Sequence, residues 1–195
     1  LVFTMITSLI LGMGSPTTAN YIITSTIALP ALIALNEMLP VSIEILAAHM
    51  FVFYFGIVAD ITPPVALAAF AATGISGGSP IRTGVNASKL AIAAFIIPYM
   101  FVLQPELLMI DTSFLEVLLI LVTAIAGMIA IGAGMIGYWY IDIGWLLRTV
   151  SLVGGLLLMY PGTYSDLIGF AIFAVMIIYQ FFKIKQSKDS MGQTA

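Results

Sequence analysis

The 195-residue chain is 62% hydrophobic and only 8% charged, with a net charge of −3 at pH 7 and a mean hydropathy of +1.16. A soluble domain carries about 25% charged residues and cannot bury so much apolar surface, so this composition indicates an integral membrane protein. The absence of cysteine excludes disulfides and thiolate metal sites in these residues. Leu1 lies inside an apolar run with no signal peptide, and we expect the chain to be the C-terminal part of a longer protein.

The first 35 residues are predicted to form two apolar helical arms joined by a turn-rich tip. Residues 1–11 are too short to span a bilayer, which needs about 20 residues. The tip covers residues 12–18, and Ser15 followed by Pro16 is typical of the start of a new helix. Two structures fit this pattern: a single kinked span, or a re-entrant hairpin over residues 1–35 whose arms return to one face of the membrane. The two glycines of the tip and the new helix start favour the hairpin.

A membrane helix predicted over residues 41–75 is interrupted at its centre. Pro63 and Pro64 lack backbone N–H groups and clash with the carbonyl four residues earlier, so regular helix cannot continue through them. Asp60 places an ionisable group in the same stretch, inside the otherwise uncharged run between residues 49 and 79. At membrane depth, broken backbone and a carboxyl group are tolerated where they line a cavity or bind a ligand. A plain structural kink and a hydrogen-bonded structural acid are the alternatives.

The remaining residues continue as membrane helices. A polar connection over residues 74–84 is followed by a membrane helix within residues 85–110, in which Pro98 is expected to cause a kink. Three further helices are expected over residues 113–183, followed by a polar, disordered tail over residues 184–195.

Successive crossings place basic and acidic residues on opposite sides of the membrane. All six Lys and Arg residues fall on one side, which the positive-inside rule makes cytoplasmic. The other side receives acidic residues only: Glu37, Glu44, Glu106, Asp111, Glu116 and Asp166. The C-terminus is therefore predicted to be cytoplasmic, and the hairpin to open outward. A kinked first span gives the same pattern, so the charges support the later crossings and do not test the hairpin.

The helix ends at the tip and at the interruption supply groups that bind ions. Carbonyls at a helix C-terminus carry partial negative charge, and N–H groups at a helix N-terminus carry partial positive charge. Around Asp60 and Thr62 the available oxygens are backbone carbonyls, a hydroxyl and a carboxylate, which suit a hard cation such as sodium. The tip repeats the arrangement with Ser15, Thr17 and Thr18. Placed together, the two segments would enclose a cation and direct helix N-termini at an anionic substrate, as in secondary transporters.

Two segments of the chain resemble the large permease subunit of TRAP (tripartite ATP-independent periplasmic) transporters. They are Gly-Met-Gly-Ser-Pro-Thr-Thr-Ala at residues 12–19 and Phe-Tyr-Phe-Gly-Ile-Val-Ala-Asp-Ile-Thr-Pro-Pro-Val-Ala-Leu at residues 53–67. The sequence is most similar to the fused type, in which small and large membrane subunits form one polypeptide that works with a TAXI-type substrate-binding protein. The likeness extends to about residue 110, and the last three helices carry no diagnostic motif.

The resemblance implies an all-α, elevator-type transporter with two inverted repeats. This chain would hold the hairpin and broken helix of the second repeat and about four further transmembrane helices. Family sodium sites lie where a hairpin tip meets a broken helix, and the matching positions here have Ser15 and Thr62 as the sodium ligands. The full set of candidate ion- or substrate-binding residues is Gly12, Gly14, Ser15, Thr17, Thr18, Asp60, Thr62 and Pro63. Ala66 departs from the unfused type, which usually has glycine after Pro-Pro-Val.

These observations predict a sodium-coupled symporter subunit of a bacterial or archaeal cytoplasmic membrane. It would import an organic anion, a carboxylate in the first instance, delivered by an extracytoplasmic TAXI-type binding protein. Its other partners would be the N-terminal part of the same permease and membrane lipid, with no nucleic acid and no cofactor besides sodium. We expect no enzyme activity, because the sequence has no phosphate-binding Gly-rich loop and no second carboxylate to pair with Asp60 at membrane depth. A proton-coupled carrier of the same architecture is the alternative, followed by an ion channel.

Overall fold

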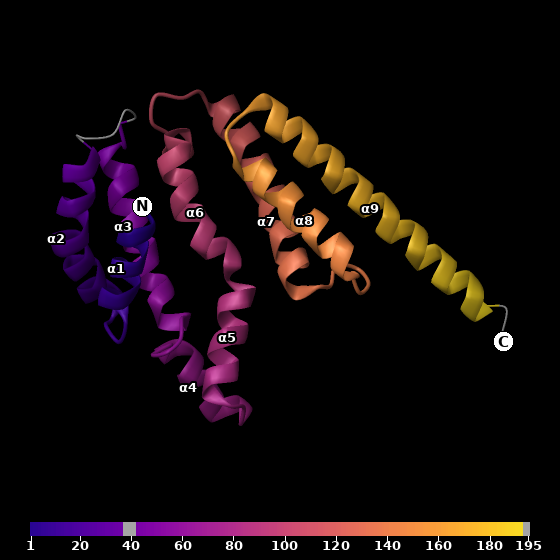
Figure 1. Cartoon of the computed structure of the whole chain (residues 1–195), viewed down its shortest axis with the longest axis horizontal. Helices are drawn as coiled ribbons and strands as arrows, with labels where there is room; N and C mark the ends of the chain where they lie inside the picture. The colour runs from indigo at the N-terminus through magenta and orange to yellow at the C-terminus, as the bar shows by residue number, and fades with distance from the viewer. Residues whose placement is uncertain (37–41, 193–195) are drawn as a thin grey trace. The chain divides into compact units, whose positions relative to one another are not determined.

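The predicted all-α membrane fold is confirmed by the computed structural model, which describes residues 1–36 and 42–192 (Figure 1). Glu37 and the last three residues of the expected tail lie outside the described residues. Three of the described helices are long and apolar enough to cross a membrane, or four if one bent pair counts as a single span. The chain divides into two compact units, residues 1–117 and residues 118–195, and we describe each by itself.

Unit 1 begins with two helices, α1 (Val2–Gly12) and α2 (Thr17–Asn36), that fold back on each other (Figure 1). The chain turns between them because Met13 is extended and Gly14 adopts a left-handed φ of +80°, which glycine tolerates best. This pairing of α1 with α2 is the hairpin form and not a single kinked span. Helix α2 is itself long and apolar enough to cross a membrane.

The predicted interruption of the next helix is present. Helix α3 (Ile45–Val58) passes into a single 3-10 turn, η1 (Ala59–Ile61), and regular helix resumes only in α4 (Leu67–Ser76). Helix α3 is the centre of unit 1, since α1, α2 and α6 all pack against it. Its Phe51 and Phe55 are fully buried and meet the ring of Tyr99 edge-on, so aromatic packing holds this core together.

Helices α5 (Pro80–Leu90) and α6 (Ile92–Leu103) form the bent pair, with an angle of 43° between them. The bend lies at Ala91, whereas Pro98 lies inside α6, and the expected kink at Pro98 stays a prediction. Different packing partners explain the position of the bend: α5 packs against α4 and η1, whereas α6 packs against α3 and the short helix η2 (Pro105–Leu108). The preceding connection is also shorter than the sequence suggested, since only residues 77–79 separate α4 from α5.

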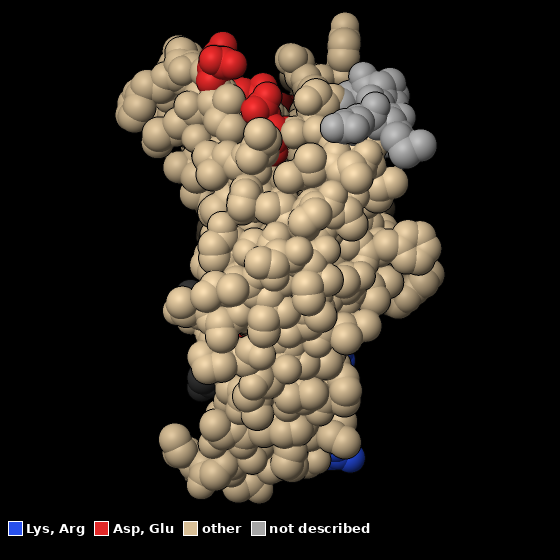
Figure 2. Space-filling view, turned by 90° about the vertical axis from the view of Figure 1, so that its left-hand side faces the viewer, with Lys and Arg blue, Asp and Glu red and all other residues tan. Residues whose placement is uncertain are grey.

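Apart from Asp60, whose turn packs against α5, the charged side chains of unit 1 separate along its length. Figure 2 looks onto this unit and shows acidic side chains gathered at one end and basic side chains toward the other. Glu44 precedes α3 and Glu106 lies in η2, while Arg82 and Lys89 are exposed on α5. Within unit 1 this arrangement matches the predicted sidedness.

Unit 2 contains most of α7 (Phe114–Ile136), together with α8 (Trp145–Met159) and α9 (Thr163–Gly192). Arg148 closes the end of α7 by donating to the carbonyls of Gly134 and Met135, at 3.0 and 2.8 Å. The backbone of α9 stays helical to Gly192, so the expectation of a disordered tail from residue 184 is wrong over most of its length. Lys and Gln in this segment are good helix formers, and polarity alone does not end a helix.

Close contact of α7 with α8 predicts opposite results for two glycines. A Cβ at Gly155 would lie 2.7 Å from the carbonyl oxygen of Gly127, whereas a Cβ at Gly132 has nothing within 4 Å. Gly155→Ala should therefore lower the free energy of unfolding by about 1–3 kcal/mol through overpacking. Gly132→Ala should leave it unchanged or raise it by up to about 1 kcal/mol through helix propensity. Thermal unfolding of the detergent-solubilised permease measures both, and equal losses in the two variants would contradict this packing.

Candidate functional site

The hairpin tip and the interruption of the α3–α4 helix lie close together because two backbones touch just before them. A Cβ placed on Gly12, the last residue of α1, would lie 2.5 Å from the carbonyl oxygen of Gly56 in α3. Only glycine leaves room for this approach. Beyond the contact, a Cβ on Gly14 would lie 3.9 Å from Val65, so the tip sits beside the interruption.

Asn20 joins the two helices at this contact. Its side-chain amide nitrogen donates to the carbonyl oxygens of both Gly12 and Gly56, and the side chain is 1% exposed. The sequence analysis missed this residue, although an isolated amide in an apolar helix, shortly after the tip, was a usable signal.

Hydrogen bonds hold the interruption in one conformation. The Thr62 hydroxyl donates to the Val58 carbonyl at 2.7 Å, and the Ala66 N–H donates to the Thr62 carbonyl at 3.1 Å. Ser88 of α5, also missed from sequence, donates to the Ile61 carbonyl at 3.0 Å. Because the proton of the Thr62 hydroxyl is used within the chain, the lone pairs of its oxygen remain free to face a cation.

Asp60 lies in the single turn η1 and is half-buried. One of its carboxylate oxygens, Oδ1, is fully buried and has no hydrogen-bond partner among the described residues. A buried oxygen without a partner costs free energy unless a proton or a cation satisfies it.

The residues of the tip differ in their surroundings. Ser15 is half-buried, whereas Thr17 and Thr18 are exposed at the start of α2. Pro63 is half-buried and packs toward α5, since a Cβ on Gly84 would lie 3.1 Å from its ring. The structure thus brings Gly12 and Gly14 close to the interruption and places Pro63 against α5. Thr17 and Thr18 lie at the surface of unit 1.

Electrostatics at this place favours a cation. Helix α1 ends at Gly12 and helix α3 ends at Val58, and α1 packs against both α3 and the turn η1 that contains Asp60. Each C-terminus carries roughly half a negative charge. No group of three His, Cys, Asp or Glu side chains that suits a transition metal occurs in the part of the chain that the structure describes. The oxygen donors that are present suit a hard monovalent or divalent cation.

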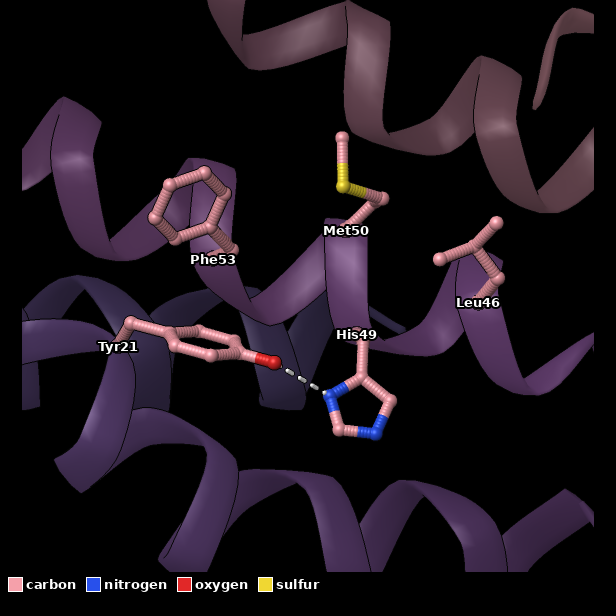
Figure 3. A pocket seen from close by; sticks show the side chains of 5 residues that line it. All are labelled: Tyr21, Leu46, His49, Met50 and Phe53. Carbon is pink, nitrogen blue, oxygen red and sulfur yellow. Dashed lines mark hydrogen bonds between the residues drawn. The ribbon is translucent and has the colours of Figure 1, made fainter.

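A separate apolar groove lies between α2 and α3 (Figure 3). It has a volume of about 400 Å³, and Tyr21, Leu46, His49, Met50 and Phe53 line it. The Tyr21 hydroxyl and His49 Nδ1 lie 2.9 Å apart and satisfy each other. His49 is seven residues before Gly56 on the same helix, about 10 Å along its axis, so this groove is not part of the tip and interruption.

Comparison with known families decides what kind of protein carries this site. The model of the family described as tripartite ATP-independent periplasmic transporter, DctM component, matches residues 1–117. The chain belongs to this family. The matched residues coincide with unit 1, which holds the tip, the interruption and Asn20. Neither a curated protein nor a solved structure matches the chain.

Membership of the DctM family makes the chain part of a TRAP transporter permease, a multi-pass protein of the inner membrane. The family is one of transporters and not of enzymes. Membership also implies association with a substrate-binding protein and a small membrane subunit.

The backbone of the interruption predicts an unusual response at Ala66. This residue is buried and adopts φ +38° and ψ +52°, the left-handed region that costs an L-amino acid about 1–2 kcal/mol. Ala66→Gly should therefore raise the free energy of unfolding by up to about 1 kcal/mol, after allowing for the greater freedom of glycine in the unfolded chain. Ala69→Gly, a buried helical position in α4, should lower it by about 1 kcal/mol. Melting temperatures of the two variants that shift in the same direction would contradict the left-handed conformation.

Proposed function

We propose that this DctM-family chain is the part of a sodium-coupled symporter that binds the coupling ion. Its cargo is an organic anion, a carboxylate in the first instance, delivered from outside by a TAXI-type binding protein. The basic side of the chain, including the C-terminus, faces the cytoplasm, and the hairpin opens outward. No enzyme chemistry and no cofactor besides sodium are needed for this function.

The observation that carries the proposal is that the C-termini of two helices meet next to the turn that holds an unpartnered carboxylate oxygen. The ends of α1 and α3 supply partial negative charge, and Asp60 supplies the rest. Thr62 and Ser15 add hydroxyl oxygens from the two segments. These oxygen ligands can replace the hydration shell of a sodium ion, which is a hard cation that polarises its ligands only weakly.

Ion binding offers a mechanism for coupling. A cation held between tip and interruption attracts both, so it orders the hairpin against the α3–α4 helix and completes the substrate site. Helix α4 starts at Leu67 with no side-chain cap, so its first N–H groups are available to an anionic substrate. The loaded unit then slides across the membrane in an elevator movement, and cytoplasmic release of sodium loosens the hairpin.

Proton coupling is the second candidate, and one observation favours it. The buried Oδ1 of Asp60 has no partner among the described residues, and a proton would satisfy it as well as a cation. In that case the carboxyl group itself carries the coupling ion, and Thr62 only shapes the backbone.

Uptake by the whole permease in proteoliposomes distinguishes the two candidates. The binding protein and substrate are supplied outside, and inward gradients of sodium and potassium are compared. Uptake driven by sodium alone supports the proposal. Equal uptake in both gradients, abolished when a pH gradient is collapsed, would replace it with proton coupling and make Asp60 the residue to study.

Sodium ligation predicts the behaviour of hydroxyl variants. Thr62→Val removes one oxygen ligand and Ser15→Ala another, so each should raise the sodium concentration for half-maximal uptake by about tenfold, the effect of roughly 1.4 kcal/mol. Thr62→Ser keeps the hydroxyl and should stay close to the parent permease. Thr73→Val is the matched control, because its hydroxyl donates only to Phe70 within α4. Unchanged sodium dependence in both Thr62→Val and Ser15→Ala would remove these two residues from the site.

A further inference from the structure

Asn20 holds together the three helices that meet at the candidate site. It lies in the first turn of α2, is 1% exposed, and donates from one amide nitrogen to Gly12 of α1 and Gly56 of α3. An amide carries two N–H groups, so one side chain can serve both carbonyls.

The two carbonyls that Asn20 contacts belong to helix ends. Gly12 is the last residue of α1, and Gly56 lies in the last turn of α3. Carbonyls in a last turn have no complete set of partners within their own helix and carry its partial negative charge. Two such ends repel each other at close range, and the neutral donor between them offsets the repulsion without adding a charge.

Glycine at both positions fixes the distance at which this bridge works. A Cβ on Gly12 would lie 2.5 Å from the Gly56 carbonyl oxygen, and a Cβ on Gly56 would collide with the Asn20 side chain. The backbones of α1 and α3 are therefore in direct contact, and the Asn20 side chain of α2 fills the space beside both glycines.

The hydrogen bonding of Asn20 is incomplete. Asn20 Oδ1 is buried with no hydrogen-bond partner among the described residues, which is a cost that an apolar side chain of the same size would avoid. What an apolar side chain would lose is the donation to α1 and α3. The residue is thus suited to setting the position of the two helices.

We propose that Asn20 is a positioning residue for ion-coupled transport. By joining Gly12 to Gly56, it keeps the tip in register with the turn that holds Asp60. It touches neither ion nor substrate, and it acts through the segments that do. Two experiments test this role. The first measures sodium-dependent uptake and rests on the proposed sodium coupling, whereas the second measures the accessibility of α1 to a thiol reagent and does not.

The first test compares transport by Asn20→Asp with transport by Thr24→Val. Asn20→Asp keeps the shape but replaces the donor with an oxygen facing two carbonyls. Thr24 lies one turn further along α2, is fully buried, and its hydroxyl donates only to carbonyls of its own helix. Asn20→Asp should raise the sodium concentration for half-maximal uptake at least tenfold, and Thr24→Val less than twofold. Asn20→Ala, which also removes the donor, serves if the aspartate variant does not accumulate. Equal sodium dependence in the Asn20 and Thr24 variants would overturn the proposal.

The second test reads the position of α1 directly and needs no transport. Ser8 lies one turn before Gly12, is fully buried, and its hydroxyl has no partner among the described residues, so Ser8→Cys removes no hydrogen bond found there. In a permease without other cysteines, labelling of this thiol by N-ethylmaleimide should be slow and should accelerate at least fivefold when Asn20→Ala is added. Thr18→Cys, exposed at the tip, should be labelled at the same rate in both backgrounds.

An unchanged rate at Ser8→Cys would overturn the proposal whichever ion drives transport. Faster labelling of Ser8→Cys in a permease whose uptake does not depend on sodium would support the role of Asn20. It would reject only the proposed sodium coupling.

Discussion

The backbone contact between α1 and α3 is the constraint on which unit 1 depends. Gly12 and Gly56 approach so closely that neither position has room for a side chain, and Asn20 bonds to both. The tip begins one residue beyond Gly12, and the turn containing Asp60 begins three residues beyond Gly56. A shift of either helix along the other would therefore separate the tip from the interruption, and the convergence of two negative helix ends would be lost.

Unpartnered polar atoms near the contact between α1 and α3 lower the free energy of unfolding of unit 1, whereas the apolar core raises it. The aromatic and aliphatic core around Phe51 and Phe55 contains no polar side chain that lacks a partner. In contrast, Ser8, Asn20 and Asp60 each leave a buried oxygen without a partner among the described residues. Each such atom costs about 1–3 kcal/mol. The contact between α1 and α3 is thus held by the nitrogen of Asn20, while nearby oxygens are left without partners, so its hydrogen bonding is less complete than that of the apolar core.

Features set by local covalent chemistry were readable from sequence, and features set by distant contacts were not. Pro63 and Pro64 predict the interruption, because a missing N–H and a rigid ring stop a helix in any context. The bend at Ala91 was not predictable, because it arises where α5 and α6 leave one set of packing partners for another. Asn20 was missed for a similar reason: its partner Gly56 is 36 residues away, and only the folded backbone brings the two together. The site residues Ser15, Thr62 and Asp60 stay predictions, since the structure shows their surroundings and not an ion.

The polar side chains of the two units differ in how they are bonded. In unit 2, Arg148 closes the end of α7 and Ser151 donates to the Ala130 carbonyl at 2.6 Å, so both are occupied by neighbouring backbone. Gln180 accepts from the Ile141 N–H at 3.1 Å and fixes the loop before α8. These contacts stabilise helix ends and helix packing, and among the described residues of unit 2 only the amide nitrogen of Gln180 is buried without a partner. In unit 1, Ser8, Asn20 and Asp60 leave buried oxygens without a partner in the region of the tip and the interruption, and Gln104 leaves one at the end of α6. Unit 1 is also the part of the chain that matches the transporter family. The proposed ion site therefore lies within the part of the chain that matches the family, and the polar side chains named in unit 2 bond to neighbouring backbone.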